Sequence, residues 1–299
     1  MGISTIQNNT FAISIKEKAK AYFELLKFRL SFLVAFSSAF GYLLATRGSI
    51  EWLSFAMLSF GGFLISGAAV TINQIIEIEL DKLMTRTEGR PLPTGRVTIA
   101  EAKFFTLIVG ITGFVLLWIF TNPLTTGLSF ISLILYSFVY TPLKRVGPIA
   151  VFVGAIPGAL PPLLGWAAAT GSISYEALII FSIQFIWQFP HFWAIAWVAD
   201  EDYKKAGFKL LPSGGKKDLN TAINIMIYTL FLIPLGLFPA KFGVTGMNSA
   251  IVATLCGILF LMQTFSLMKD GSRKSALRIM FGSFLYLPIV QIAFLIDKV

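Results

Sequence analysis

The sequence predicts an all-α fold, a polytopic membrane helical bundle of about nine transmembrane helices. Of its 299 residues, 56% are hydrophobic and only 13% are charged, and the mean hydropathy is +0.78. A soluble domain has roughly 45–50% apolar and about 25% charged residues. Apolar runs of about 20 residues, the length that a helix needs to cross a bilayer, recur along the chain. With a single cysteine, Cys256, the sequence also excludes a disulfide framework and a thiolate metal cluster.

The apolar runs predict nine spans, at residues 30–46, 53–76, 102–120, 124–140, 147–168, 175–199, 221–239, 247–268 and 276–296. No internal repeat or low-complexity linker divides the chain, so we expect one transmembrane domain over residues 1–299. Residues 1–25 are polar and mildly basic, and we expect them to form a cytoplasmic segment before the first span. They show neither the short apolar core of a cleavable signal nor the pattern of a transit peptide.

The basic residues predict the orientation of the chain. With nine spans, 21 of the 24 Lys and Arg residues fall on one side, and only Arg47, Lys241 and Lys298 fall on the other. Cytoplasmic loops carry the excess of basic residues in multi-pass proteins. We therefore expect a cytoplasmic N-terminus and an external C-terminus in the cell (inner) membrane. The same rule explains most of the net charge of +9, which thus indicates no nucleic-acid partner.

Carboxylates gather at two points on the predicted cytoplasmic side, and the first group ends span 53–76. Asn73, Glu77 and Asp81 are spaced four apart, which places them on one helix face with a rise of ~6 Å per step. Glu79 points roughly away from that face. Mg²⁺ commonly binds one or two protein carboxylates plus substrate phosphate oxygens. The spacing therefore predicts a site for a divalent cation.

Two arginines follow this group, and they suit a phosphate ligand. The guanidinium groups of Arg86 and Arg90 match the geometry of phosphate oxygens. The run 90–93, Arg-Pro-Leu-Pro, is expected to end the helix. Together with the acids, these residues predict a metal–diphosphate site. The alternative is a solvated loop of mixed charge. Asn73 and Glu77 argue against it, because they lie close to the hydrocarbon region, where polar side chains are costly.

The second acidic group is Asp200, Glu201 and Asp202, directly after span 175–199. Lysines and a helix-stopping Pro212 follow it. Taken alone, such a segment is usually a loop. Paired with the first group, it predicts two acidic stations on different helices that hold two metal ions over one diphosphate.

Two further features point to the same end of the bundle. Tyr140 and Lys144 are four apart and share a helix face, so both side chains can reach a leaving diphosphate. The alternative is an interfacial tyrosine beside ordinary cytoplasmic basic residues. His191, the only histidine, lies within span 175–199 among four aromatic residues. It is either a hydrogen-bonded structural residue, a base, or a group that approaches the iron of a flat ring system.

These motifs resemble a known superfamily. Asn73, Glu77 and Asp81 resemble the first aspartate-rich motif of the intramembrane UbiA-type prenyltransferases, and Tyr140 with Lys144 resembles their Tyr-x-x-x-Lys element. From about Lys27 to its end, the chain is similar to one branch, the family of protohaem IX farnesyltransferases or haem O synthases. The segments that carry this likeness are Met84-x-Arg86-Thr87-x-x-Arg90-Pro91-Leu92, Pro190-His191-Phe192-Trp193, and Asp202-Tyr203-x-x-x-Gly207 with Leu211-Pro212.

The chain departs from the superfamily pattern at two places. Glu77 stands where the first motif commonly has Asp, and its longer side chain can still bind Mg²⁺. The second motif often has two Asp residues four apart, and Ala199 and Tyr203 occupy those positions. Any of the three carboxylates at 200–202 therefore remains a candidate metal ligand. The haem O synthases share this departure.

The resemblance implies a UbiA-like prenyltransferase fold and Mg²⁺ as cofactor. The implied reaction transfers a farnesyl group from farnesyl diphosphate to a vinyl group of haem B, which gives a hydroxyethylfarnesyl side chain, haem O and diphosphate. Implied partners, besides the lipid bilayer, are a haem A synthase or a terminal oxidase assembly. The expected roles are metal binding by Glu77, Asp81 and Asp202, substrate binding by Asn73, Arg86, Arg90, Tyr203 and Lys205, and catalysis by Tyr140, Lys144 and His191.

Two other functions remain open at this point. One is prenyl transfer to an aromatic quinone precursor, against which the aromatic surroundings of His191 and the Asp202-Tyr203 pair argue. The other is an ion-coupled transporter. Transporters commonly show duplicated halves and charges near the membrane midplane. Here the halves show no duplication, and the acids gather at one face.

Overall fold

The computed structural model describes residues 14–299 and confirms the all-α class, since this part of the chain contains helices and no strand. Within it, nine helices are long and apolar enough to span a membrane, and each expected span end lies within three residues of the observed one. They are α2 Phe28–Ala45, α3 Trp52–Ile76, α5 Ile99–Phe120, the continuous run of α6 Pro123–Ile134, π-helix η1 Leu135–Tyr140 and α7 Thr141–Leu143, α8 Ile149–Thr170, α9 Tyr175–Val198, α11 Leu219–Lys241, α12 Met247–Asp270 and α13 Arg273–Ile296.

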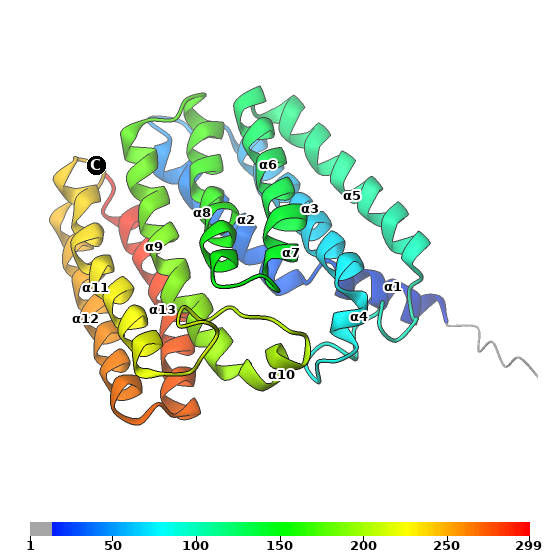
Figure 1. Ribbon diagram of the computed structural model, residues 1–299. Helices are drawn as coiled ribbons and strands as arrows, with labels where there is room; N and C mark the ends of the chain where they lie inside the picture. Colours follow the sequence, from blue (N-terminus) through cyan, green and yellow to red (C-terminus); the bar gives the residue numbers. More distant parts are fainter. Residues whose placement is uncertain (1–13) are drawn as a thin grey trace, which may run out of the picture.

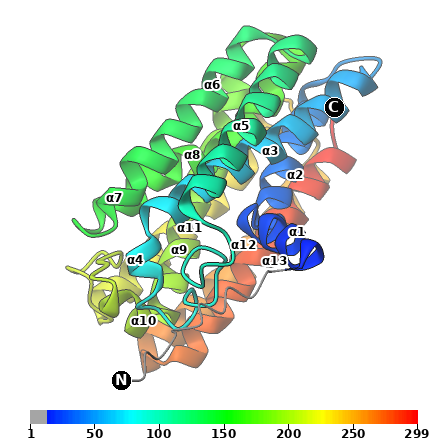
Figure 2. The same cartoon turned by 90° about the vertical axis from the view of Figure 1, so that its right-hand side faces the viewer.

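The helices form one bundle, in which both neighbours in sequence and helices far apart in the chain pack along one another. The pairs α3 with α5, α2 with α8, and α11 with α12 make the most extensive contacts. Two short helices, α4 Ile78–Asp81 and α10 Asp200–Lys205, lie at the end of the bundle opposite the C-terminus (Figure 1). The view turned by 90° shows the same arrangement (Figure 2). The two predicted acidic groups therefore lie at the same end of the bundle.

The expected N-terminal segment 1–25 lies partly outside the described residues. Its last part forms helix α1 Ile15–Leu25, which begins at a capping box between Ser14 and Glu17. Ala21 and Leu25 of α1 are buried in a small apolar cluster with residues of the α4–α5 connection. Ion pairs tie the same helix to this region, Lys18 to Glu101 and Arg96 to Glu24, each at 2.8 Å. Helix α1 therefore packs against the end of the bundle that carries α4 and α10.

Glycines set the close approach of α2 and α8. A Cβ on Gly165 of α8 would collide with the backbone of Ser38, and a Cβ on Gly41 of α2 would collide with the backbone of Pro162. Small residues let membrane helices pack at short distance, because lipid supplies no hydrophobic drive for association. This contact forms one wall of the core.

Pro162 in α8 frees a carbonyl group that a neighbouring helix satisfies. Pro162 has no N–H, so the Gly158 carbonyl has no helical partner. Gln184 of α9 donates to that carbonyl at 2.8 Å, and its own oxygen accepts from Gln291 at 3.0 Å and from Ser37 at 3.2 Å. A buried backbone group in a membrane needs such a partner. This network joins α2, α8, α9 and α13.

The helix that carries the first acidic group ends earlier than the sequence predicted. Helix α3 stops at Ile76, and the short α4 ends at Asp81, so the expected stop at the 90–93 run was wrong. The Thr87 hydroxyl donates to the Asp81 carbonyl at 2.9 Å and replaces a helical hydrogen bond there. From this point the chain turns, and residues 82–98, called the 82–98 loop below, connect α4 to α5.

Candidate functional site

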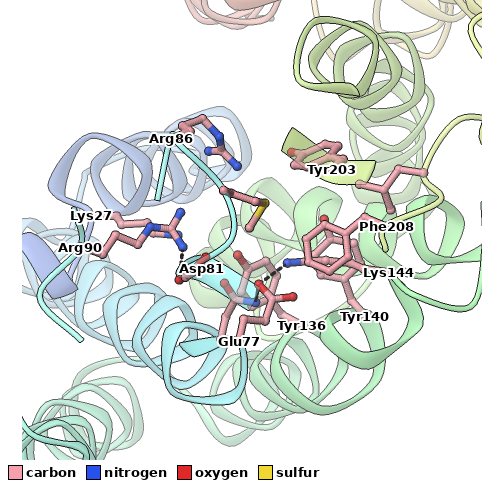
Figure 3. Close-up of a pocket in the computed structure, with 13 residues that line it drawn as sticks. Lys27, Glu77, Asp81, Arg86, Arg90, Tyr136, Tyr140, Lys144, Tyr203 and Phe208 are labelled. Atoms are coloured by element: carbon pink, nitrogen blue, oxygen red, sulfur yellow. Dashed lines mark hydrogen bonds and ion pairs between the residues drawn. The ribbon is translucent and has the colours of Figure 1, made fainter. Parts of the chain in front are cut away.

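A polar cavity of about 90 Å³ lies where the 82–98 loop meets α10 and the end of the α6–α7 span (Figure 3). Four cationic side chains and two carboxylates contribute to its lining. The excess of positive charge suits an anionic ligand, and the carboxylates suit a cation beside it. The lining residues are Lys27, Asn73, Glu77, Asp81, Met84, Arg86, Arg90, Tyr136, Tyr140, Lys144, Tyr203, Phe208 and Leu210.

The expected shared face of Asn73, Glu77 and Asp81 is confirmed, because all three residues line this cavity. Glu77 is 3% exposed and Asp81 is 0% exposed. Glu77 Oε2 accepts from Lys144 Nζ and from Asn73 Nδ2, both at 2.9 Å. Asp81 Oδ2 accepts from Arg90 Nη1 at 2.6 Å. Glu79, as expected, points away: its side chain is 75% exposed and pairs with Lys82.

One oxygen of each buried carboxylate remains open. Glu77 Oε1 and Asp81 Oδ1 are buried and have no hydrogen-bond partner among the described residues. Burying an unpaired polar atom is costly, and more so when it carries charge. A hard cation would satisfy both oxygens, and Mg²⁺ takes its other ligands from water and substrate phosphate. The described residues contain no group of three or more His, Cys, Asp or Glu side chains that would hold a metal alone. The Glu77–Asp81 pair therefore fits a Mg²⁺ ion whose remaining ligands come from water and from the substrate.

Tyr140 and Lys144 share a face as expected, and both line the cavity. Lys144 Nζ lies 5.0 Å from the centroid of the Tyr140 ring and 5.5 Å from that of Phe208. Tyr140 ends the π-helix η1, an irregularity that the sequence did not predict and that often occurs at functional sites. Gly154 of α8 makes room for the tyrosine, since a Cβ there would lie 2.6 Å from its ring.

Three further cations surround the carboxylates, and one of them was missed by sequence analysis. Arg86 and Arg90 line the cavity as predicted. By its sequence Lys27 is only one of the basic residues expected on the cytoplasmic side, yet it also lines the cavity. It joins α1 to α2 with a φ of 45°, and it is the only non-glycine residue with positive φ within residues 14–299. Such strained conformations tend to persist at functional sites. No signal in the local sequence marks this turn.

The second acidic group does not line the cavity, although Tyr203, the residue that follows it, does. Asp200 pairs with Lys204 and Lys217, at 2.9 and 3.2 Å. Glu201 is exposed. Asp202 binds the backbone of the 82–98 loop and pairs with Lys205 at 3.0 Å, and Lys205 also lies outside the lining. The structure thus separates these carboxylates from Glu77 and Asp81.

His191 also lies outside the cavity lining. It is part of α9, seven residues before the end of that helix at Val198. Its ring stacks on Trp187 with centroids 4.4 Å apart. Phe192 and Phe284 make T-shaped contacts with the same ring, with centroids 5.3 and 5.2 Å away. Its Nδ1 forms a 2.8 Å hydrogen bond with the Ser283 hydroxyl of α13. The Ser283 hydroxyl also donates to the Met280 carbonyl at 2.6 Å, so the histidine is tied to the backbone of α13 through this serine.

Comparisons with known proteins agree with this arrangement. The model of the UbiA prenyltransferase family matches residues 34–287. The protoheme IX farnesyltransferase of Cytophaga hutchinsonii is 56% identical over 280 residues, which cover 94% of this chain and 98% of that protein. The solved structure of a digeranylgeranylglyceryl phosphate synthase has a TM-score of 0.78 at 24% identity, and the match covers 94% of this chain and 98% of that one. A UbiA homologue from Archaeoglobus fulgidus bound to GPP and Mg²⁺ has a TM-score of 0.61 at 16% identity, over 92% and 99% of the chains.

Lys27 gives the site a pH dependence that can be measured. Burial, together with the nearby charges of Arg90 and Lys144, lowers the pKa of Lys27 to about 7. The lysine is therefore protonated below that pH and neutral above it, whereas a bound diphosphate favours the protonated form. Binding above pH 7 must then include proton uptake. We expect the affinity for inorganic pyrophosphate with Mg²⁺ to fall by up to ~10-fold per pH unit from about pH 7 to about pH 9.

Calorimetric titrations at several pH values measure this effect. The Lys27→Arg variant should bind with little of this pH dependence, because a guanidinium stays charged throughout the range. Arg29→Met is the matched control, since Arg29 is exposed and two residues away. An equal pH slope in wild type and Lys27→Arg contradicts the assignment.

Proposed function

The chain belongs to the UbiA prenyltransferase family, and we propose that it converts haem B to haem O by transferring the farnesyl group of farnesyl diphosphate to a porphyrin vinyl group. The observation that carries this function is the cavity at the end of an apolar bundle. In it, four cationic side chains surround two carboxylates that each have one oxygen without a hydrogen-bond partner. The high identity to a protoheme IX farnesyltransferase over almost the whole chain supports the choice of substrates.

The reaction begins with departure of the diphosphate. The bond between the farnesyl C1 carbon and the diphosphate oxygen breaks, and its electron pair leaves with the diphosphate. Arg86, Arg90, Lys144 and Lys27 surround the place where that negative charge develops. Donors fixed in a buried site stabilise such charge more than water does, because they need no reorganisation. The Tyr140 hydroxyl is a further donor at the same cavity.

Magnesium is the proposed cofactor. Glu77 and Asp81 would hold it through their open oxygens, with Asn73 held against Glu77 beside them. When bound, Mg²⁺ would neutralise charge on the diphosphate oxygens. The UbiA homologue bound to GPP and Mg²⁺ supports this proposal at the level of the family.

The acceptor is proposed to bind along α9, between the cavity and His191. The farnesyl carbon bonds to the vinyl group of haem B, and a water oxygen then bonds to the remaining vinyl carbon and loses a proton. Trp187, Phe192 and Phe284 give His191 an aromatic setting that suits a porphyrin face. In this proposal His191 positions the porphyrin or accepts the proton of that water.

The same end of the bundle is proposed to face the cytoplasm, in a bacterial cell membrane, with residues 1–299 acting as one domain. The distribution of 21 of 24 basic residues to this side supports that orientation. Haem O leaves as a lipophilic product, so a haem A synthase or a terminal oxidase assembly is the proposed recipient in the same membrane.

The metal–diphosphate site predicts loss of product in two variants. Asp81→Ala removes an open carboxylate oxygen, and Arg90→Ala removes its cationic partner and leaves Asp81 unpaired. Each should lower haem O formation by ~100-fold or more, because groups that stabilise developing charge typically contribute that much. Haems extracted from cells expressing each variant are quantified by mass spectrometry. Undiminished haem O in both variants would remove the assignment, and prenylation of 4-hydroxybenzoate in place of haem B would favour the quinone alternative.

The acceptor side predicts a different kinetic result. His191→Phe keeps an aromatic ring but removes both ring nitrogens, so it should slow farnesyl transfer to haem B by ~10-fold or more while binding of farnesyl diphosphate stays unchanged. Tyr140→Phe is the comparison, since it acts on the diphosphate side. Initial rates at varied concentrations of each substrate separate the two effects. Equal loss of farnesyl diphosphate affinity in His191→Phe contradicts an acceptor role.

The orientation predicts the sides of the two chain ends. A reporter that works only outside the cytoplasm should be active when fused after Val299 and inactive when fused before Met1. Activity at both ends, or the reverse pattern, contradicts the proposed topology.

A further inference from the structure

The carboxylates at this end of the bundle fall into two classes. Glu77 and Asp81 line the cavity, and each keeps one buried oxygen without a partner. Asp202 does not line the cavity, and both of its oxygens are engaged. Because a metal ligand needs an oxygen that is free to face the ion, these two classes suit different tasks.

Asp202 is bound to the 82–98 loop by backbone hydrogen bonds. Its Oδ1 accepts from the Thr85 N–H at 3.3 Å and its Oδ2 accepts from the Arg86 N–H at 3.1 Å. Lys205, one turn later on α10, donates to Asp202 Oδ1 at 3.0 Å and to the Thr85 hydroxyl at 3.1 Å. Lys205 and the two backbone amides hold the pKa of Asp202 below its usual range. The carboxylate is therefore charged and already compensated by the protein.

The hydrogen bond to Asp202 fixes the backbone of Arg86, whose side chain lines the cavity. The Arg86 guanidinium lies 5.8 Å from the centroid of the Tyr203 ring, and Tyr203 is the neighbour of Asp202 on α10. Tyr203 in turn packs against Phe208, with centroids 5.7 Å apart. Helix α10 thus holds Arg86 at two points, its backbone through Asp202 and its side chain through Tyr203.

We propose that Asp202 is a positioning residue, and not a metal ligand: it ties the 82–98 loop to α10 and thereby holds Arg86 over the diphosphate. This inference rests on the proposed function. It assigns to Asp202 a task other than the metal binding that the sequence motif suggested. Orienting a charged side chain before the substrate arrives lowers the ordering cost of binding.

Metal binding separates the two roles of Asp202 directly. Mn²⁺, a paramagnetic substitute for Mg²⁺, is titrated into the purified protein with pyrophosphate and followed by electron paramagnetic resonance. Asp202→Asn should bind as many Mn²⁺ ions as wild type, with an affinity within ~3-fold, because the lost charge is not in contact with the ion. Glu201→Gln makes the same charge change on the exposed side of α10 and is the matched control. Loss of a bound Mn²⁺ in Asp202→Asn, but not in Glu201→Gln, overturns the proposal.

A double-mutant cycle tests whether Asp202 acts through Arg86. Asp202→Ala should raise the KM for farnesyl diphosphate by ~10-fold, as expected for loss of hydrogen bonds to a charged group, and should also lower kcat, because Arg86 stabilises the charge that develops on the diphosphate. Arg86→Ala should raise KM at least as much, and the double variant should match Arg86→Ala alone. Additive effects overturn the proposal. Asp202→Asn, which keeps one acceptor oxygen for the loop, should recover part of the KM and covers the case in which Asp202→Ala fails to fold.

The Asp81→Asn variant distinguishes failure of this inference from failure of the proposed function. If Asp81→Asn loses Mn²⁺ and haem O while Asp202→Asn also loses Mn²⁺, only the role given to Asp202 is wrong. If Asp81→Asn keeps both Mn²⁺ and haem O formation, the proposed metal site itself is wrong, whatever the result at Asp202.

Discussion

The architecture of this end of the bundle depends on keeping two buried carboxylates charged beside a membrane. Glu77 and Asp81 are almost fully buried, and an unpaired charge with that burial would be very costly. Lys144 and Arg90 each pair with one carboxylate oxygen. The other oxygen of each group stays open. The pair is thus neutralised enough to fold and still able to accept a divalent cation, which is a condition that a solvated acidic loop would not meet.

Two irregular stretches of backbone lie beside Glu77 and Asp81 and shape the cavity that they line. Helix α3 breaks at Glu77, and η1 widens the end of the α6–α7 span. The Thr141 hydroxyl bridges the two breaks, since it accepts from Asn73 at 3.0 Å and donates to the Tyr136 carbonyl at 2.9 Å. Membrane proteins tolerate non-helical backbone only where it lines a cavity or is buried in protein. The regular remainder, with its glycine contacts and the Gln184 network, forms the frame that holds these breaks in place.

What the sequence predicted follows from local rules, and what it missed depends on distant contacts. The face shared by Asn73, Glu77 and Asp81 was predictable because helix periodicity is a local property. Lys27 was not, because its side chain reaches the cavity only through a left-handed turn between α1 and α2. The contacts of Asp202 were not either, since they join residues 116 and 117 positions apart. Spacing along one helix thus predicts which residues share a face, whereas tertiary packing decides which residues line the cavity and which oxygen remains free.

The position of His191 within α9, before the end that leads to α10, bears on the identity of the acceptor. His191 precedes the end of α9 at Val198 by seven residues, which corresponds to ~10 Å of helix. In the proposed reaction, one molecule must lie against His191 and also present carbon to the farnesyl group near the cavity. A single-ring quinone precursor is shorter than this length of helix, whereas a porphyrin with its vinyl groups at the edge is comparable to it. If His191 contacts the acceptor, the geometry therefore favours a macrocycle, and the aromatic side chains around the histidine supply flat surfaces of the kind that a macrocycle needs.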